Sequence, residues 1–141
     1  MTGRGDERAI LVAYRDLLVR LDKEVARAEA GTAAIGGLTK AGVLLESLLR
    51  EVAAFLGLRV DSRKATIGDL AVVIVQQGRA PSGSTFVDDC IKELRKPRNR
   101  FDRMRALRNA NAHDGGLPDL NAAKQTMQSL AGFLRSVGPR S

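Results

Sequence analysis

Apolar residues recur along this chain at three- and four-residue steps, with charged residues between them. The first such segment, residues 6–30, starts on acidic residues that suit a helix N-terminus and is followed by Gly31 as a stop. A second amphipathic helix is predicted over residues 38–57, with Gly57 at its end. The predicted buried stripes are Ile10, Tyr14, Leu17, Leu18, Leu21, Val25 and Ala28 in the first helix, and Leu45, Leu48, Val52 and Phe55 in the second, with Leu44, Leu49 and Leu56 beside it.

The segment TIGDLAVVIVQQG, residues 66–78, is ambiguous because its run AVVIV also suits a buried strand. Thr66 followed by Asp69 matches a capping box, and Gly78 stands where a helix C-cap glycine belongs. A lone strand would have no partner elsewhere in the chain. The segment is therefore predicted to be helical.

Three more helices are predicted after the loop APSGS, over residues 84–96, 98–113 and 118–137. Pro97 separates the first two, because proline disfavours helical geometry in the residue before it, and Pro118 suits the first turn of the last. The fold is therefore expected to be all-α, an up-and-down bundle of five to six helices in one domain over residues 1–141. The predicted buried residues are Phe86, Val87, Cys90, Ile91 and Leu94 in the fourth helix and Leu120, Ala123, Met127, Leu130, Ala131 and Leu134 in the last.

Composition agrees with helix packing. The 141 residues are 44% hydrophobic, with no Trp, one Tyr and four Phe, so the core must be aliphatic. The single cysteine, Cys90, excludes an internal disulfide and metal sites built on cysteine pairs, and is expected to be a buried, reduced thiol. No signal-like segment or apolar run of about 20 residues is present. We expect a cytoplasmic protein with no membrane contact, no metal and no cofactor.

Basic residues are concentrated late in the chain. The net charge of +7 implies attraction to polyanions, and only Glu93 and Asp102 oppose the cations between positions 92 and 108. Arginine dominates this run, and its planar fork holds phosphate oxygens in pairs. The run therefore favours nucleic-acid binding, the alternative being a solvated helix face. Its eight cations are Lys92, Arg95, Lys96, Arg98, Arg100, Arg103, Arg105 and Arg108.

The stretch RALRNANAHDGG, residues 105–116, contains the only histidine. Arg108 falls on the edge of the apolar face that Phe101, Met104 and Leu107 define. Since an unpaired buried charge is costly, this position indicates either a solvent-filled cleft or an arginine paired with a carboxylate. His113 lies about 140° further around an ideal helix. The two side chains therefore meet only if the helix loosens or a second chain completes the site. A dipole-favoured cap at the helix C-terminus is the simpler role for His113.

The segment LRNANAHD resembles the signature of the HEPN family (higher eukaryotes and prokaryotes nucleotide-binding domain), in which Arg, a following polar residue and a later His recur. Arg108, Asn109 and His113 match these positions. The resemblance implies a helical bundle that dimerises and a metal-independent endoribonuclease with both motifs in a shared cleft. Arg108 would clamp the phosphate, Asn109 would orient the scissile group or His113, and two histidines would supply acid and base.

The implied partners are RNA, a second copy of the chain, and an antitoxin or other protein from a neighbouring gene. Arg98, Arg100, Arg103 and Arg105 are the residues predicted to bind RNA. HEPN toxins that are controlled by nucleotidyltransferase antitoxins resemble one another in a Tyr two positions after the His, where this chain has Gly115. Two alternatives stay open: a non-catalytic module of the same fold that binds RNA, nucleotide or protein, and a basic helical adaptor or DNA-binding protein.

Overall fold

The computed structural model describes residues 7–32, 35–60, 65–114 and 120–138; of positions 35, 108–114 and 120 it describes the backbone alone. These residues form α1 (Glu7–Glu29), α2 (Ile35–Phe55), α3 (Ile67–Gln77), α4 (Thr85–Leu94), α5 (Arg100–Asp114) and α6 (Leu120–Val137). The described chain is therefore an all-α helical bundle, as expected.

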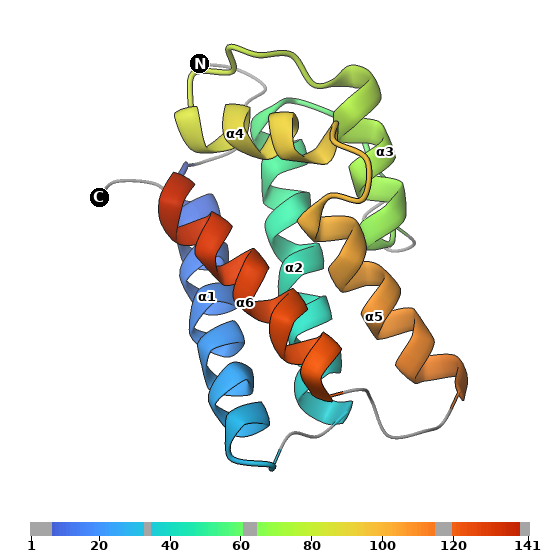
Figure 1. The fold of residues 1–141 in the computed structure, drawn as a ribbon. Helices are drawn as coiled ribbons and strands as arrows, with labels where there is room; N and C mark the ends of the chain where they lie inside the picture. Colours follow the sequence, from blue (N-terminus) through green and yellow to red (C-terminus); the bar gives the residue numbers. More distant parts are fainter. Residues whose placement is uncertain (1–6, 33–34, 61–64, 115–119, 139–141) are drawn as a thin grey trace.

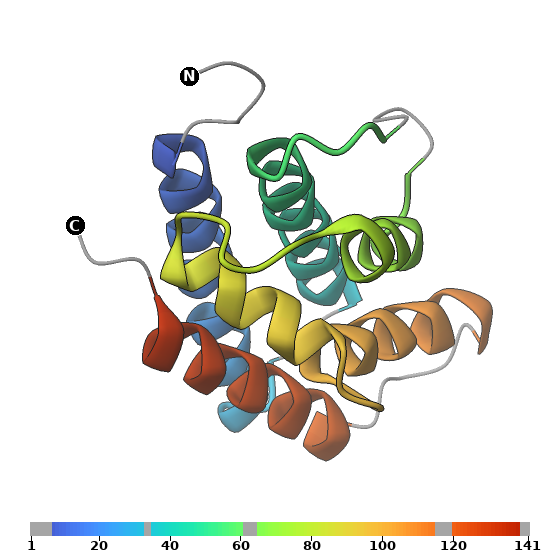
Figure 2. The same ribbon diagram turned by 90° about the horizontal axis from the view of Figure 1, so that it is seen from above.

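The helices are not all parallel or antiparallel to one another. α1 and α2 lie side by side in opposite directions, and so do α5 and α6, while α6 also packs along α1 (Figure 1). α4 instead runs across one end of the bundle, as the view from above shows (Figure 2). The up-and-down arrangement thus holds for these pairs, and α4 departs from it.

Glycine ends the first two helices, as predicted. Gly31 and Gly57 have φ angles of 74° and 73°, a left-handed conformation that glycine adopts without a Cβ clash. Beyond Gly57, the N–H of Leu58 donates to the carbonyl oxygen of Ala53 at 2.9 Å, which satisfies one of the last free carbonyls of α2.

The capping box at the start of α3 is present. Thr66 Oγ1 accepts a hydrogen bond from the Asp69 N–H at 3.3 Å, and Asp69 Oδ2 accepts from the Thr66 N–H at 3.1 Å. This confirms the helical interpretation of residues 66–78. Gly78 is the C-cap, but its φ is −69°. Glycine is favoured at this position for a steric reason, since a Cβ would lie 2.4 Å from the carbonyl oxygen of Ile74.

The helix predicted over residues 98–113 begins at Arg100 and continues to Asp114. Asn99 Oδ1 accepts the N–H of Asp102 at 2.9 Å, so Asn99 caps the helix in the usual manner. Arg98 has a φ of 52° and therefore belongs to the turn between α4 and α5. The helix begins two residues later than predicted because the Asn99 side chain caps its first turn, which competes with extension of the helix to residue 98.

The core is aliphatic, as composition predicts. Cys90 is fully buried, and burial raises the pKa of its thiol, with the nearby charges of Asp89 and Glu93 acting in the same direction. Within the described ranges, no helix is both long and apolar enough to cross a bilayer. The largest fully buried side chains are Leu17, Leu21, Leu45, Leu48, Leu49, Leu70, Ile74, Ile91, Phe101, Met104, Met127 and Leu130.

Candidate nucleic-acid interface

The N-terminal half of α5 is fixed against the bundle by its apolar face. Phe101 and Met104 are fully buried, and Leu107 packs against the core. The ring of Phe101 meets that of Phe133 on α6 edge-to-face, with centroids 5.8 Å apart. Further along, α5 diverges from α6, and its C-terminal turns extend to the margin of the molecule in both views (Figures 1 and 2).

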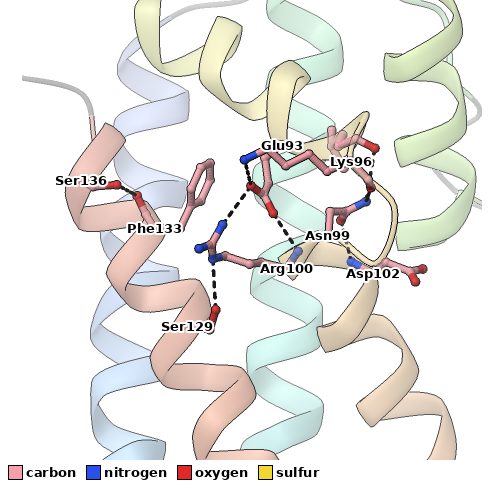
Figure 3. A network of polar contacts seen from close by, with 9 residues as sticks. Glu93, Lys96, Asn99, Arg100, Asp102, Ser129, Phe133 and Ser136 are labelled. Atoms are coloured by element: carbon pink, nitrogen blue, oxygen red, sulfur yellow. Dashed lines mark hydrogen bonds and ion pairs between the residues drawn. The ribbon is translucent and has the colours of Figure 1, made fainter.

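Arg100, one of the four arginines predicted to bind RNA, is held by an internal network (Figure 3). Its Nη1 is 2.9 Å from Oε1 of Glu93, whose side chain is only 2% exposed, and its backbone N–H donates to Oε2 of the same carboxylate at 2.9 Å. Arg100 Nε donates to Ser129 Oγ at 3.0 Å, and its Cζ lies 5.4 Å from the ring centroid of Phe133. This side chain therefore joins α4, α5 and α6.

Lys96 adds a second cation to the Glu93 carboxylate, at 3.4 Å. A buried carboxylate needs such partners because an unpaired buried charge is costly. Glu93 was read in the sequence only as an acidic residue within a basic run. No local pattern in the sequence distinguishes Glu93 from an exposed glutamate. Its partner Arg100 is brought close by the turn between α4 and α5 and by a hydrogen bond to Ser129 on α6.

Arg105 also has an internal partner. Its Nε and Nη2 both donate to Oδ1 of Asp102, at 3.0 and 2.7 Å. The aliphatic part of the side chain lies over Gly68 at the start of α3, where a Cβ would be 3.5 Å from Arg105 Cδ. Asp102 and Arg105 line a hollow of about 310 Å³ between α3 and α5, together with Val72, which is 53% exposed.

Arg98 and Arg103 differ from the other two. Both are exposed, and among the described residues no carboxylate forms an ion pair with either of them. Their charges are therefore available to an external anion. The structure thus separates the four predicted RNA-binding arginines into two with internal acidic partners and two without.

The backbone of Arg108, Asn109 and His113 lies in the last turns of α5. Because the helix is continuous to Asp114, positions 108 and 113 differ by about 140° around its axis. The side chains of these three residues lie outside the described part of the chain. The structure therefore gives the position of the predicted site on α5 and no side-chain contacts within it. Among the described residues, no group of three or more His, Cys, Asp or Glu side chains is arranged to hold a metal ion.

Comparison of the chain with known protein families, with curated proteins and with solved structures finds no match.

Proposed function

We propose that this protein is a metal-independent endoribonuclease of the HEPN type, whose site is formed by Arg108, Asn109 and His113 of α5. The observation that carries the proposal is the sequence of these residues on one helix, preceded by exposed arginines without acidic partners in the described chain. Exposed arginines can bind the phosphate oxygens of a nucleic-acid backbone bidentately.

The proposed chemistry uses only the substrate and protein side chains. A neutral His113 takes the proton from the RNA 2′-hydroxyl, the 2′-oxygen attacks phosphorus, and the bond to the 5′-oxygen breaks as a second acid protonates it. The products are a 2′,3′-cyclic phosphate and a 5′-hydroxyl. Arg108 stabilises the charge on the phosphorane, and Asn109 orients the scissile group or His113.

One chain has one histidine, whereas the reaction needs both an acid and a base. A two-fold dimer that brings two α5 helices together supplies both. The position of the C-terminal turns of α5 at the margin of the molecule suits such an arrangement (Figure 1). We place the activity in the cytoplasm, in a toxin–antitoxin or anti-phage system, with RNA as substrate and an antitoxin or other neighbouring-gene protein as regulator.

The alternative function is a non-catalytic module of the same fold that binds RNA, nucleotide or a partner protein. One observation favours it. The contact of Arg100 with Glu93 and the Asn99 cap at the start of α5 both hold the helix in the bundle, so neither requires a catalytic site to explain it. Under this alternative, the intact protein binds RNA without cleaving it, and that binding survives the loss of His113.

The test is cleavage of labelled single-stranded and structured RNAs in EDTA by the intact protein and by His113→Ala and Arg108→Ala. Lys23→Ala, an exposed site on α1, is the matched control for loss of a charge. We expect cleavage by the intact protein and the control, loss in both site variants, and 2′,3′-cyclic phosphate ends. A folded protein that binds RNA without cleaving it would support the alternative, and cleavage that persists without His113 would contradict the assignment.

A further inference from the structure

Two arginines from different elements converge on one carbonyl oxygen at the C-terminal end of α3. Arg79 Nη1 donates to the carbonyl oxygens of Gln76 at 3.4 Å and Gly78 at 3.3 Å. Arg95, which follows the last residue of α4, donates from Nη2 to the same Gly78 oxygen at 3.2 Å. The two guanidinium groups therefore lie close together, because each donates to the Gly78 carbonyl oxygen, although sixteen positions separate the two residues in the sequence.

This pair of like charges has no acidic partner in the described chain. Arg79 and Arg95 are both exposed, and among the described residues neither forms an ion pair. The partial negative charge at the end of α3 offsets only part of two full positive charges. Each guanidinium carries five N–H donors, so most of them remain for an external acceptor with several oxygens.

The hollow beside Arg95 is lined by side chains of both charges, and the exposed cations continue from it toward α5. Arg95 and the exposed Lys92 line a hollow of about 370 Å³ on α4. Asp88 and Asp89 also line this hollow, and Asp88 Oδ1 accepts a hydrogen bond from the Ser82 N–H at 2.8 Å. From Arg95 the chain passes directly through the turn that contains Arg98 into α5 (Figure 2).

We propose that Arg79 and Arg95 bind a phosphodiester group of RNA and form the far end of a track that follows the α4–α5 turn and α5 toward His113. The inference rests on the proposed function and names where its substrate extends beyond the cleavage site. The fifteen residues of α5 span about 22 Å, so the track contacts several successive phosphates. A guanidinium group can bind phosphate oxygens bidentately, and a phosphate chain repeats its negative charge along the length of the exposed arginines.

The test is binding of a labelled single-stranded RNA to His113→Ala protein, with and without Arg79→Ala/Arg95→Ala, across a series of salt concentrations. We expect about ten-fold weaker binding at low salt. We also expect the magnitude of the slope of log K against log salt to fall by about 0.7, as for the loss of one phosphate contact on a single strand. In the otherwise intact protein, the same double change should raise KM and leave kcat unchanged.

Two control proteins keep the result interpretable. Arg15→Ala/Lys23→Ala removes the same charge from exposed positions of α1 and should leave the salt slope unchanged. Arg79→Gln/Arg95→Gln retains donors toward Gly78 without the charges, so it should fold normally and bind RNA as weakly as the alanine variant.

The outcomes separate this inference from the proposed function. Binding that depends on Arg79 and Arg95 in a protein that cleaves no RNA supports the track and contradicts the nuclease. Cleavage with an unchanged salt slope and unchanged KM in the double variant would overturn the track alone. A lower melting temperature with full RNA affinity would also overturn it, because the arginines would then only cap α3. Preference for anionic vesicles or an acidic peptide over RNA would overturn the assigned ligand.

Discussion

The carboxylate of Glu93 accepts both the backbone N–H and the guanidinium of Arg100, each at 2.9 Å, and only 2% of the Glu93 side chain is exposed. One acidic side chain at the end of α4 thus fixes the first residue of α5. Through Ser129 and Phe133, Arg100 extends the same contact to α6 (Figure 3). The buried carboxylate of Glu93 therefore adds polar contacts to the apolar packing that holds the start of α5 against α4 and α6.

Glu93→Gln should destabilise the protein by about 2 kcal/mol, because hydrogen bonds to a charged group are lost and Arg100 keeps no counter-charge. Glu29→Gln is the matched control, since Glu29 is 53% exposed and pairs with Lys124 at 3.6 Å; its cost should stay below about 0.5 kcal/mol. Urea unfolding of both variants measures the difference. Equal values for the two substitutions would show that the Glu93 network contributes no special stability.

Arg103→Ala and Arg100→Ala should have opposite consequences. Arg103 is exposed without an acidic partner in the described chain, so its loss should lower the salt slope of single-stranded RNA binding by about 0.7 with little change in stability. Arg100→Ala should lower stability by about 2 kcal/mol, since it leaves Glu93 with fewer partners, and should leave the salt slope unchanged. Titrations with RNA at several salt concentrations, beside urea unfolding, distinguish the two. Reversed roles would contradict the separation of the arginines into internal and external groups.

Mixing subunits tests whether the nuclease site is shared between two chains. If each site needs a histidine from both copies, wild-type protein equilibrated with a roughly nine-fold excess of His113→Ala should lose about ten-fold of its cleavage rate per wild-type chain, because most wild-type chains then pair with an inactive one. An excess of Lys23→Ala protein is the control and should add activity. An unchanged rate per wild-type chain would place a complete site within one subunit.

Gly78→Ala and Gly132→Ala should change stability in opposite directions. A Cβ at position 78 would lie 2.4 Å from the Ile74 carbonyl oxygen and 3.2 Å from Leu56 Cδ1, so the substitution should cost about 1–3 kcal/mol. At Gly132, within α6, nothing lies within 4 Å of the added atom, and alanine should stabilise the helix by about 1 kcal/mol. Thermal melting of both variants gives the comparison. A neutral Gly78→Ala would mean that the end of α3 shifts without strain.

The buried thiol of Cys90 should react with a thiol reagent at pH 8 only after unfolding. Burial raises its pKa above the ordinary value of 9.0, so the folded protein retains the proton while the unfolded chain loses it above about pH 9. The contribution of Cys90 to the free energy of unfolding is therefore fully present below pH 9. Above pH 9 it should fall by up to about 1.4 kcal/mol per pH unit. Urea unfolding between pH 7 and 10 measures this, with Cys90→Ala as the control that lacks this contribution. Rapid labelling of the folded protein would contradict the burial.

Much of the fold was predictable because its signals are local. The three- and four-residue spacing of Leu17, Leu21, Leu45 and Leu48 reports helical faces, and the Thr66–Asp69 capping box identified α3 despite its strand-like run. Such patterns depend on the geometry of a single helix, so the amino-acid sequence contains them in full. The start of α5 was displaced by two residues because a cap at Asn99 and a helix extended to Arg98 are close alternatives locally.

The sequence by itself determined the helical elements, the aliphatic core, the excess of positive charge and the order of Arg108, Asn109 and His113 along one helix. Only the tertiary structure decided which cations are available to a ligand. Arg100 and Arg103 are alike in the sequence, yet Arg100 contacts Glu93 while Arg103 faces solvent. Arg79, in the loop after α3, lies beside Arg95 at the end of α4. The physical reason is that pairing of charges depends on distances of a few ångströms between elements, and those distances are set by how the helices pack.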